Sequence, residues 1–293
     1  MKAIKLASVF AVSAVAAAVS TSTFAVEPVF SGEAGIEYVS YYGESKDTGD
    51  LADGTDLGEV ELSIDTGVVY AEIEVKTTGN DEGTDINFEK LYVKQGAVSF
   101  GRFDGSVSTG AFMGMDELQS GVDLRTAQGD TDNTGLRYAV APGLTVALEA
   151  TTNSNDDSDI GAAISYVVDL DAVKLGISGG AIGDANSVNV GAQFNAGPAT
   201  LSANYGVGET GTDNTTDVQQ AGFGVELAAT DALTLILQYS KDLEGDKEDG
   251  TYFVAEYAAG DLTYYYKNYN GDLAADSSYE GSEHHTVGVK AFF

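Results

Sequence analysis

Residues 97–142 read AVSFGRFDGSVSTGAFMGMDELQSGVDLRTAQGDTDNTGLRYAVAP. Two short runs within them, AVSFGRF at 97–103 and TGLRYAV at 134–140, alternate apolar and polar residues as β-strands do. Between these runs, residues 104–132 show no sustained period of either 2 or 3.6 residues. A loop of this length in a compact domain is usually functional. We therefore interpret the rest of the chain as a frame for this loop.

The same alternation continues on both sides of the loop, in runs of roughly 8–12 residues. In the run from Phe30 to Tyr38, for example, Ala34 and Ile36 share one face while Glu33 and Glu37 share the other. The run 86–94 changes its apolar parity near Lys90, which predicts a β-bulge. Counted along the chain, these runs predict sixteen strands, an even number.

The connections between the expected strands alternate in length. Seven tight ones are expected near 65–67, 95–96, 141–143, 169–171, 196–198, 229–231 and 259–261. Eight longer polar ones are expected at 43–56, 77–84, 104–132, 152–158, 183–187, 208–217, 241–250 and 270–283. This is the pattern of sixteen up-and-down strands whose two chain ends lie on the short-loop side.

Alternation of this kind fits two architectures. In a soluble β-sandwich the apolar faces would pack against each other. In a transmembrane β-barrel they face lipid, strands of about 9–11 residues cross the bilayer, and short turns and long loops segregate to opposite sides. We favour the barrel, because few connections have the length of Greek-key crossovers and closure pairs every backbone group within lipid. The fold class expected is all-β, a sixteen-stranded antiparallel transmembrane barrel with its third external loop folded inward.

The beginning of the chain indicates its compartment. Lys2 and Lys5 precede an apolar stretch from Leu6 to Val19, and Thr-Phe-Ala at 23–25 is a typical cleavage site. We expect residues 1–25 to be a signal peptide and 26–293 to be the barrel domain. Removing two lysines from the leader leaves 12 basic against 46 acidic residues, a net charge of −34. That balance argues against binding nucleic acid, and the absence of cysteine excludes disulfides and thiolate sites.

In layout, the chain now resembles the general porins of Gram-negative outer membranes. The segment FEKLYVKQGAVSFGRFDG from residue 88 looks like the strand pair of that family that ends in a Gly-Arg step. NTGLRYAVAPGL from residue 133 resembles its Asn-Ser-x-Arg-Tyr-x-x-x-x-Gly-Leu signature, and the terminal Phe293 resembles its assembly signal. The resemblance implies a homotrimer in the bacterial outer membrane. Its implied partners are membrane lipid and lipopolysaccharide, the outer-membrane assembly machinery, and the small hydrophilic solutes and ions that pass through.

The resemblance also implies a pore constriction. In the family, the third loop carries carboxylates that face an arginine-rich wall, and Asp116 and Glu117 match that acidic segment best. Arg137 matches one wall arginine, and its parity opposite Leu136 and Tyr138 also points it into the lumen. Arg102 matches a second, although its parity reaches the lumen only if the strand bends. Arg137 also fits a plain ion pair with a carboxylate of a neighbouring strand.

The chain departs from the family on the opposite wall. Glu61 and Asp85 stand where some members place arginines, and Glu72 faces the lumen by parity. The wall is therefore expected to be less basic, and the pore to prefer cations. We add Asp123 and Arg125 of the loop to the candidate constriction.

The sequence also bears on three other functions: a substrate-specific channel, a structural or adhesive barrel, and a hydrolase. A substrate-specific channel for oligosaccharides would need aromatic rails, but alternation sends only Tyr265 of the run Tyr264–Tyr266 inward. A structural or adhesive barrel would use its acidic loops. A hydrolase is disfavoured, because Gly176-Ile-Ser-Gly-Gly180 around Ser178 lacks the helix that a nucleophile elbow requires. We expect no enzyme activity, no cofactor and no metal site, since adjacent His284 and His285 lie on opposite faces of a strand and no acidic run matches an EF-hand.

Overall fold

The computed structural model describes most of the expected barrel domain. The described residues are 29–42, 49–51, 59–78, 83–118, 120–124, 132–152, 158–211, 216–245, 247–271, 273 and 283–293. The expected leader at 1–25 and Arg125 lie outside these ranges. Within them, no helix is long and apolar enough to cross a membrane.

The described part of the chain forms seventeen β-strands. They are β1 (Val29–Tyr41), β2 (Gly49–Leu51), β3 (Glu59–Asp65), β4 (Val69–Thr78), β5 (Gly83–Gln95), β6 (Val98–Asp104), β7 (Asp132–Ala141), β8 (Leu144–Thr152), β9 (Ser158–Leu170), β10 (Val173–Ile182), β11 (Ala185–Ala196), β12 (Ala199–Thr210), β13 (Thr216–Ala228), β14 (Leu233–Asp242), β15 (Asp249–Ala259), β16 (Leu262–Gly271) and β17 (His284–Phe292). From β3 to β17, each strand pairs antiparallel with the next along the chain.

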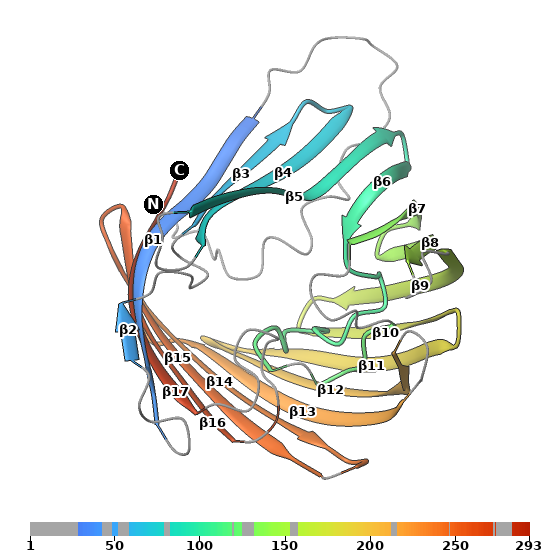
Figure 1. Cartoon of the computed structure of the whole chain (residues 1–293). Helices are drawn as coiled ribbons and strands as arrows, with labels where there is room; N and C mark the ends of the chain where they lie inside the picture. Colours follow the sequence, from blue (N-terminus) through green and yellow to red (C-terminus); the bar gives the residue numbers. More distant parts are fainter. Residues whose placement is uncertain are drawn as a thin grey trace.

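The sheet closes on itself through β1. Along one edge β1 pairs with β17, from Glu33 opposite Phe292 to Tyr41 opposite His284, and along the other it pairs with β3. Sixteen strands therefore form a closed antiparallel barrel, which confirms the architecture expected from the sequence (Figure 1). The additional strand β2 has three residues and pairs with β1 beyond the end of β3, a pairing that the sequence did not predict.

The barrel is apolar outside and polar inside. In β8, Leu148 is 56% exposed whereas the next residue, Glu149, is 1% exposed. In β11, Val188 is 49% exposed and Asn189 is fully buried. Alternate side chains of a strand point to opposite faces, so the exposed apolar residues cover the outer wall and the buried polar ones point inward. A soluble sandwich would show the opposite distribution, and closure excludes it.

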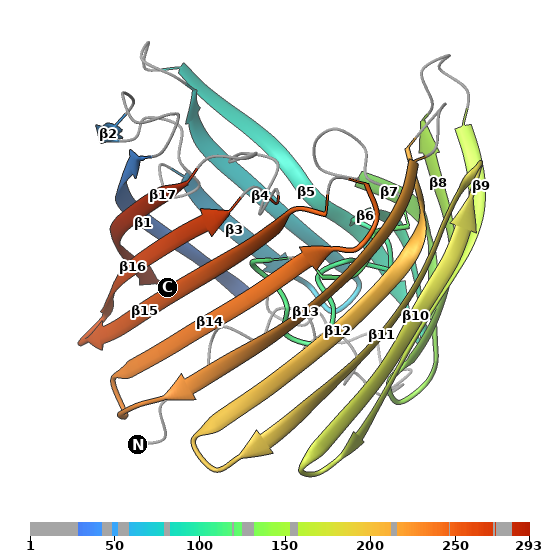
Figure 2. The same cartoon turned by 90° about the horizontal axis from the view of Figure 1, so that it is seen from below.

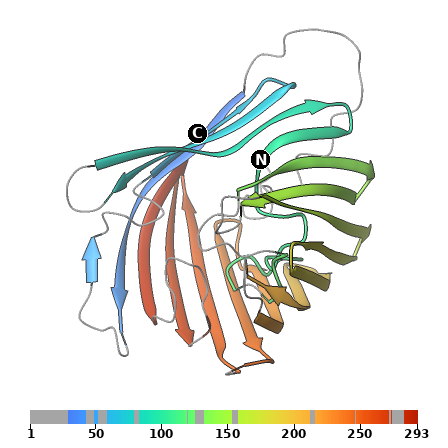
Figure 3. The same ribbon diagram turned by 45° about the vertical axis from the view of Figure 1, so that its right-hand side comes forward.

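The turns follow the predicted order with one correction. The seven tight turns lie on one side of the barrel, at the predicted places (Figures 2 and 3). The longer connection expected at 183–187 is wrong: only Gly183 and Asp184 separate β10 from β11, and Gly183 has the positive φ that so tight a turn needs. The bulge predicted near Lys90 is confirmed, because the register of β4 and β5 shifts between Glu72 and Ile73, leaving Glu89 as the extra residue.

Candidate pore constriction

The loop that follows β6 folds into the barrel. We call residues 104–132 the lumen loop, and Figure 1 shows its described part as a green trace inside the ring, beside β10 to β13. Its described part doubles back like a hairpin: the amide of Gly121 donates to the carbonyl of Gly110 at 3.1 Å, and that of Leu124 to Ser108 at 2.9 Å. The loop thus has a descending leg that contains Ser108 and Gly110, a tip (residues 112–118), and a returning leg that contains Gly121 and Leu124.

Apolar side chains anchor the loop to the inner wall. Met115, Leu118 and Leu124 are all fully buried. Leu118 packs with Tyr252 and Val254 of β15 and Tyr269 of β16, and Leu124 packs with small and aliphatic residues of β9 to β11, namely Ala163, Ile182 and Ala185. Burying a Leu side chain contributes about 1.5–3 kcal/mol, so these contacts hold the loop against the wall.

Glycines make room for the loop on the same wall. A Cβ atom at Gly206 of β12 would lie 2.6 Å from the Cα of Gly121, and one at Gly222 of β13 would lie 2.5 Å from the Cβ of Ser120. A Cβ at Gly191 of β11 would lie 2.8 Å from the Cβ of Met113. A side chain at one of these inward positions therefore fits only if the loop moves away from the wall by a small distance.

Three inward amide side chains bind the loop backbone. Asn189 of β11 accepts from the amide of Val122 at 2.7 Å and donates to its carbonyl at 2.9 Å. Asn204 of β12 donates to the carbonyl of Phe112 at 3.1 Å. Gln238 of β14 accepts from the backbone amides of two tip residues, Glu117 and Leu118. Sequence reasoning missed this set, because inward Asn and Gln are also the ordinary lining of a wet lumen.

Arg137 and Glu149 bind the root of the lumen loop. The guanidinium of Arg137 donates to the carbonyl of Gly105 at 2.7 Å and lies 4.2 Å from the centre of the Phe103 ring. Glu149 of β8 accepts from the amide of Val107 at 3.1 Å, and its carboxylate lies 4.0 Å from Arg137. Arg137 thus faces the lumen side, as parity predicts. It also lies close to Glu149 of the neighbouring strand, as in the alternative of a plain ion pair.

The tip carries the two predicted loop acids. Asp116 is exposed and Glu117 half-buried. They line a hollow together with wall residues of β11 to β14: Gln193, Thr200, Ser202, Gly224, Val225, Glu226, Ile236 and Gln238. The surrounding protein desolvates Asp116, and the nearby carboxylates of Glu117 and Glu226 add to the effect, so the pKa of Asp116 is raised above its ordinary value.

Asp123 has a different role in the loop. Its carboxylate accepts from the amide of Gly110 at 2.5 Å and so joins the returning leg to the descending one. Burial raises the pKa of Asp123, although the hydrogen bonds from Gly110 and Thr109 act in the opposite direction. The structure therefore places Asp123 within the loop's own framework.

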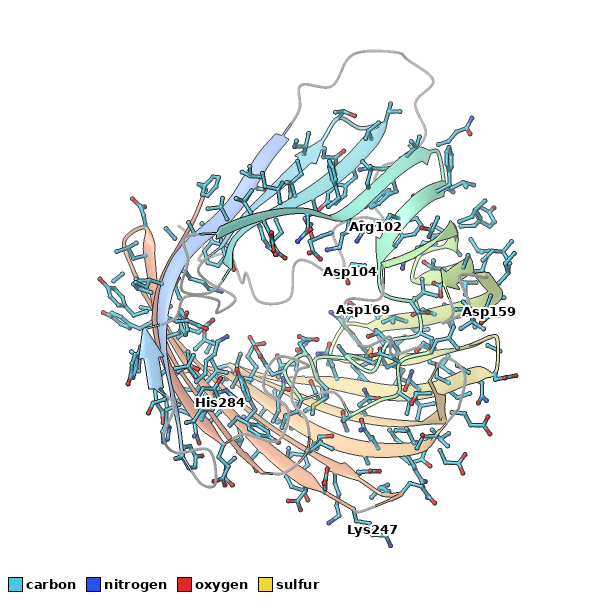
Figure 4. The ribbon with its side chains drawn as sticks, in the orientation of Figure 1. Arg102, Asp104, Asp159, Asp169, Lys247 and His284 are labelled. Carbon is cyan, nitrogen blue, oxygen red and sulfur yellow. The ribbon has the colours of Figure 1, made fainter. Side chains whose placement is uncertain are left out.

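Carboxylates gather on the wall formed by β1, β3 and β4. The register sets Glu61 directly opposite Glu33 on one side and Glu74 on the other. Two residues from Glu74 along β4, Glu72 forms an ion pair with Lys90 at 2.5 Å. Lys90 also lies 3.6 Å from Asp104, which Figure 4 labels at the lumen. Glu33 has Lys290 of β17 at 3.4 Å. Both predicted wall acids, Glu61 and Glu72, therefore belong to one inward cluster.

A short aromatic stack lies beside these acids. Tyr70 and Tyr92 stack at 5.0 Å between ring centres, and Tyr92 meets Phe103 at 4.9 Å. Lys94 lies over Tyr70 at one end, and Arg137 covers Phe103 at the other. The rings face one another, so their flat faces are already occupied. Sequence reasoning missed this stack, because its members lie on three separate strands.

Other candidate residues lie away from the lumen loop's tip. The register pairs Arg102 with Leu91 and Thr134, whose side chains are exposed on the outer face, so its place at the constriction stays a prediction. Ser178 lies within strand β10, with no turn to make it an elbow. His284 is buried on the inner side and His285 is exposed, as expected for neighbours in a strand (Figure 4). Among the described residues, no group of three or more potential ligands is placed to hold a metal ion.

A closed sixteen-stranded barrel with a loop folded into its lumen is the architecture of outer-membrane porins, and comparisons with solved structures agree. OmpT with loop L8 deleted, an outer membrane protein of Vibrio cholerae, has a TM-score of 0.62 at 17% identity, covering 91% of this chain and 99% of the other. OmpF of Salmonella typhi, in complex with daunomycin, has a TM-score of 0.61 at 14% identity, covering 91% and 97%. A porin mutant of Rh. blastica has a TM-score of 0.59 at 15% identity, covering 91% and 100%.

These neighbours show that the chain has the porin-type fold of outer-membrane barrels. They agree with the bacterial outer-membrane location expected from the sequence. No family model and no curated protein matches the sequence.

Proposed function

We propose that this protein is a porin, a passive water-filled channel for small hydrophilic solutes and ions in the bacterial outer membrane. The apolar outer wall and the closed backbone ladder suit lipid, and the polar inner wall suits water. The lumen loop narrows the passage without filling it with an apolar core of its own. The protein acts without catalysis, cofactor or resident metal.

The channel prefers cations. The observation that carries this proposal is the presence of carboxylates on both sides of the lumen: Asp116 and Glu117 on the loop tip, and Glu61 and Glu74 on the wall. Rings of acidic side chains favour cation passage, and low-dielectric walls focus their field. The cations Lys90 and Lys290 of the wall are each already paired with a carboxylate.

The test is the reversal potential of the purified protein in a planar bilayer under a KCl gradient. The wild type should give discrete openings and a cation-selective potential. The double variant Asp116→Asn with Glu117→Gln should weaken that preference. Glu209→Gln, on the outer face of β12, removes one acid outside the lumen and is the matched control. Anion preference in the wild type, or equal potentials in all three proteins, would contradict the proposal.

The rival functions are separated in the same apparatus. A channel specific for oligosaccharides would be blocked by added sugars, and a structural or adhesive barrel would not conduct. Tyr70, Tyr92 and Phe103 contact one another through their rings, and Lys94 and Arg137 cover the two ends of the stack. Few ring faces remain for a sugar, so we expect no block.

Assembly is proposed on the family resemblance and on the trimer form of the OmpT neighbour. We expect a homotrimer surrounded by lipid and lipopolysaccharide, exported by the signal peptide 1–25 and inserted by the outer-membrane assembly machinery. Phe293, 60% exposed at the end of the chain after β17, is the expected assembly signal. An unboiled sample that runs as an SDS-resistant oligomer would support the trimer, and a monomer would contradict it.

A further inference from the structure

Gln238 lies on the inner face of β14, under the tip of the lumen loop. Its side chain is 3% exposed and satisfies three backbone groups of the loop. The amide oxygen accepts from the backbone N–H of Glu117 at 3.1 Å and of Leu118 at 2.8 Å. The amide nitrogen donates to the carbonyl of Gly114 at 3.3 Å.

These contacts bracket the acidic part of the tip. Gly114 lies on one side of Asp116 and Leu118 on the other, so one side chain joins both ends of the turn that carries Asp116 and Glu117. A side-chain amide has an acceptor and a donor in one planar group. An ionised carboxylate has no donor, and a hydroxyl has both functions on a single atom.

The other two wall amides act elsewhere on the loop. Asn189 holds Val122 of the returning leg, and Asn204 holds the carbonyls of Gly110 on the descending leg and of Phe112, the first residue of the tip. Of these three amides, Gln238 is thus the one that reaches both sides of the turn carrying the acids.

We propose that Gln238 is the positioning residue that sets the place of the selectivity acids in the lumen. This inference rests on the proposed channel function and assigns to Gln238 the control of both pore width and charge position. With Gln238 in place, the tip is held as one rigid turn. Without it, two amides and one carbonyl lose their partner, and the turn leaves the wall for lumen water.

The first experiment compares Gln238→Ala with wild type in single-channel recordings. Losing three hydrogen bonds should raise the undocked fraction of the tip roughly tenfold or more, seen as increased open-channel noise and a smaller cation reversal potential. Gln219→Ala is the matched control, because Gln219 on neighbouring β13 bonds to Tyr205 outside the lumen. Gln238→Leu, which keeps side-chain volume, guards against a folding defect and should behave like Gln238→Ala. Quiet, fully selective channels in both Gln238 variants would overturn the proposal.

A disulfide rescue separates positioning from a direct effect of the amide dipole on ions. The chain has no cysteine, so Met113→Cys with Gly191→Cys creates a single possible bridge. A Cβ added at position 191 would lie 2.8 Å from the Cβ of Met113, and a shift of about 1 Å gives disulfide geometry. In the Gln238→Ala background, oxidation should restore quiet, selective openings and reduction should abolish them. If the oxidised channel stays noisy and unselective, Gln238 does not act by positioning the tip.

A spin label makes the test independent of conduction. A nitroxide on Asp116→Cys should be immobilised with Gln238 present and mobile in the Gln238→Ala background, in detergent-solubilised barrel. If the wild type does not conduct, the proposed function fails, yet the label still decides whether Gln238 holds the tip. Equal label mobility in the two backgrounds would contradict the inference.

Discussion

The inner faces of two walls of this barrel differ in chemistry although both follow the same alternation. On β10 to β14 many inward positions hold glycine, serine and amide side chains, among them Asn189, Gly206 and Gln238, and the lumen loop lies against them. On β1, β3 and β4 the inward positions hold carboxylates, with Glu61 between Glu33 and Glu74. One wall is the docking surface of the loop, and in the function we propose the other lines the passage.

Each wall carries a cost that its role explains. Glycine within a strand is destabilising by about 0.5–1 kcal/mol relative to alanine, and here it allows the loop backbone to approach the sheet. Like charges directly opposite on neighbouring strands are also destabilising, and Glu33, Glu61 and Glu74 form such a row. The alternation decides which residues point inward, and their chemistry decides whether the wall binds protein or attracts ions.

The largest effect is expected where the docking surface is filled. Gly206→Leu places a side chain where its Cβ alone would lie 2.6 Å from both Gly121 and Val122. Overpacking costs about 1–3 kcal/mol, so the returning leg should detach and single-channel conductance should rise. Ala203→Leu, at a position of β12 opposite Phe223 of the outer face, adds the same kind of side chain towards lipid and should leave conductance unchanged. A Gly206→Leu channel of wild-type conductance would mean that the loop does not limit the pore.

The second prediction compares charge on the two sides of the passage. Glu61→Gln with Glu74→Gln removes two carboxylates from the lining wall, as Asp116→Asn with Glu117→Gln removes two from the tip. Both double variants should lower the cation reversal potential, and the quadruple variant should lower it further, because charges on both sides contribute to the field. Single-channel noise should stay at the wild-type level in the wall variant, because Glu61 and Glu74 lie on β3 and β4 and the tip docks on the wall of β10 to β14. A wall variant with unchanged selectivity would locate the filter on the loop alone.

Much of the barrel could be predicted from local pattern, because in a closed sheet the side-chain period alone decides inside from outside. Ile36, exposed, and Glu37, buried, illustrate this. The turn Gly183-Asp184 is shorter than the predicted connection 183–187, because a polar stretch does not reveal where the next strand begins to pair. The strand β2 has only three residues and no periodic signal.

The contacts of the lumen loop with the wall could not be predicted from the sequence alone, because they depend on the fold. Whether an inward amide meets water or a loop backbone depends on neighbours far away in the chain: Gln238 and Glu117 are 121 residues apart. Arg137 shows the same limit. Parity and resemblance placed it in the lumen, but its bond to the carbonyl of Gly105 depends on the path of the loop root.

The third prediction uses that contact. Arg137→Ser should increase cation preference by removing a positive charge, and it should also loosen the loop root, since hydrogen bonds of charged groups contribute about 1.5–3 kcal/mol. Arg137→Lys keeps the charge but loses the planar donor group that lies over Phe103 and reaches Gly105. It should therefore keep wild-type selectivity and show more open-channel noise. If Arg137→Lys is as quiet as wild type, the root contact does not hold the loop.

The smallest effect is expected from a change of pH. It distinguishes Asp116 of the tip from Asp123, which bonds the two legs of the loop. The pKa of Asp116 is raised above 3.8, first by desolvation and then by Glu117 and Glu226. Lowering the pH should therefore discharge Asp116 earlier than an ordinary aspartate, and the cation reversal potential should begin to fall at a correspondingly higher pH. Asp116→Asn should remove that early part of the titration.

The raised pKa of Asp116 also determines whether lowering the pH favours or disfavours docking of the tip. A carboxyl group whose folded-state pKa is raised favours the folded arrangement when protonated, and that contribution is lost as pH rises through the raised pKa. Open-channel noise from the tip should therefore fall together with selectivity as the pH is lowered. The pKa of Asp123 is also raised. Its side-chain oxygen accepts the hydrogen bond that joins the two legs, and asparagine keeps such an oxygen. Asp123→Asn therefore removes the titration without removing the bond. If noise in the Asp123→Asn channel still decreases on acidification while Asp116→Asn is insensitive, the effect belongs to the tip; the reverse result would assign it to the bond between the legs.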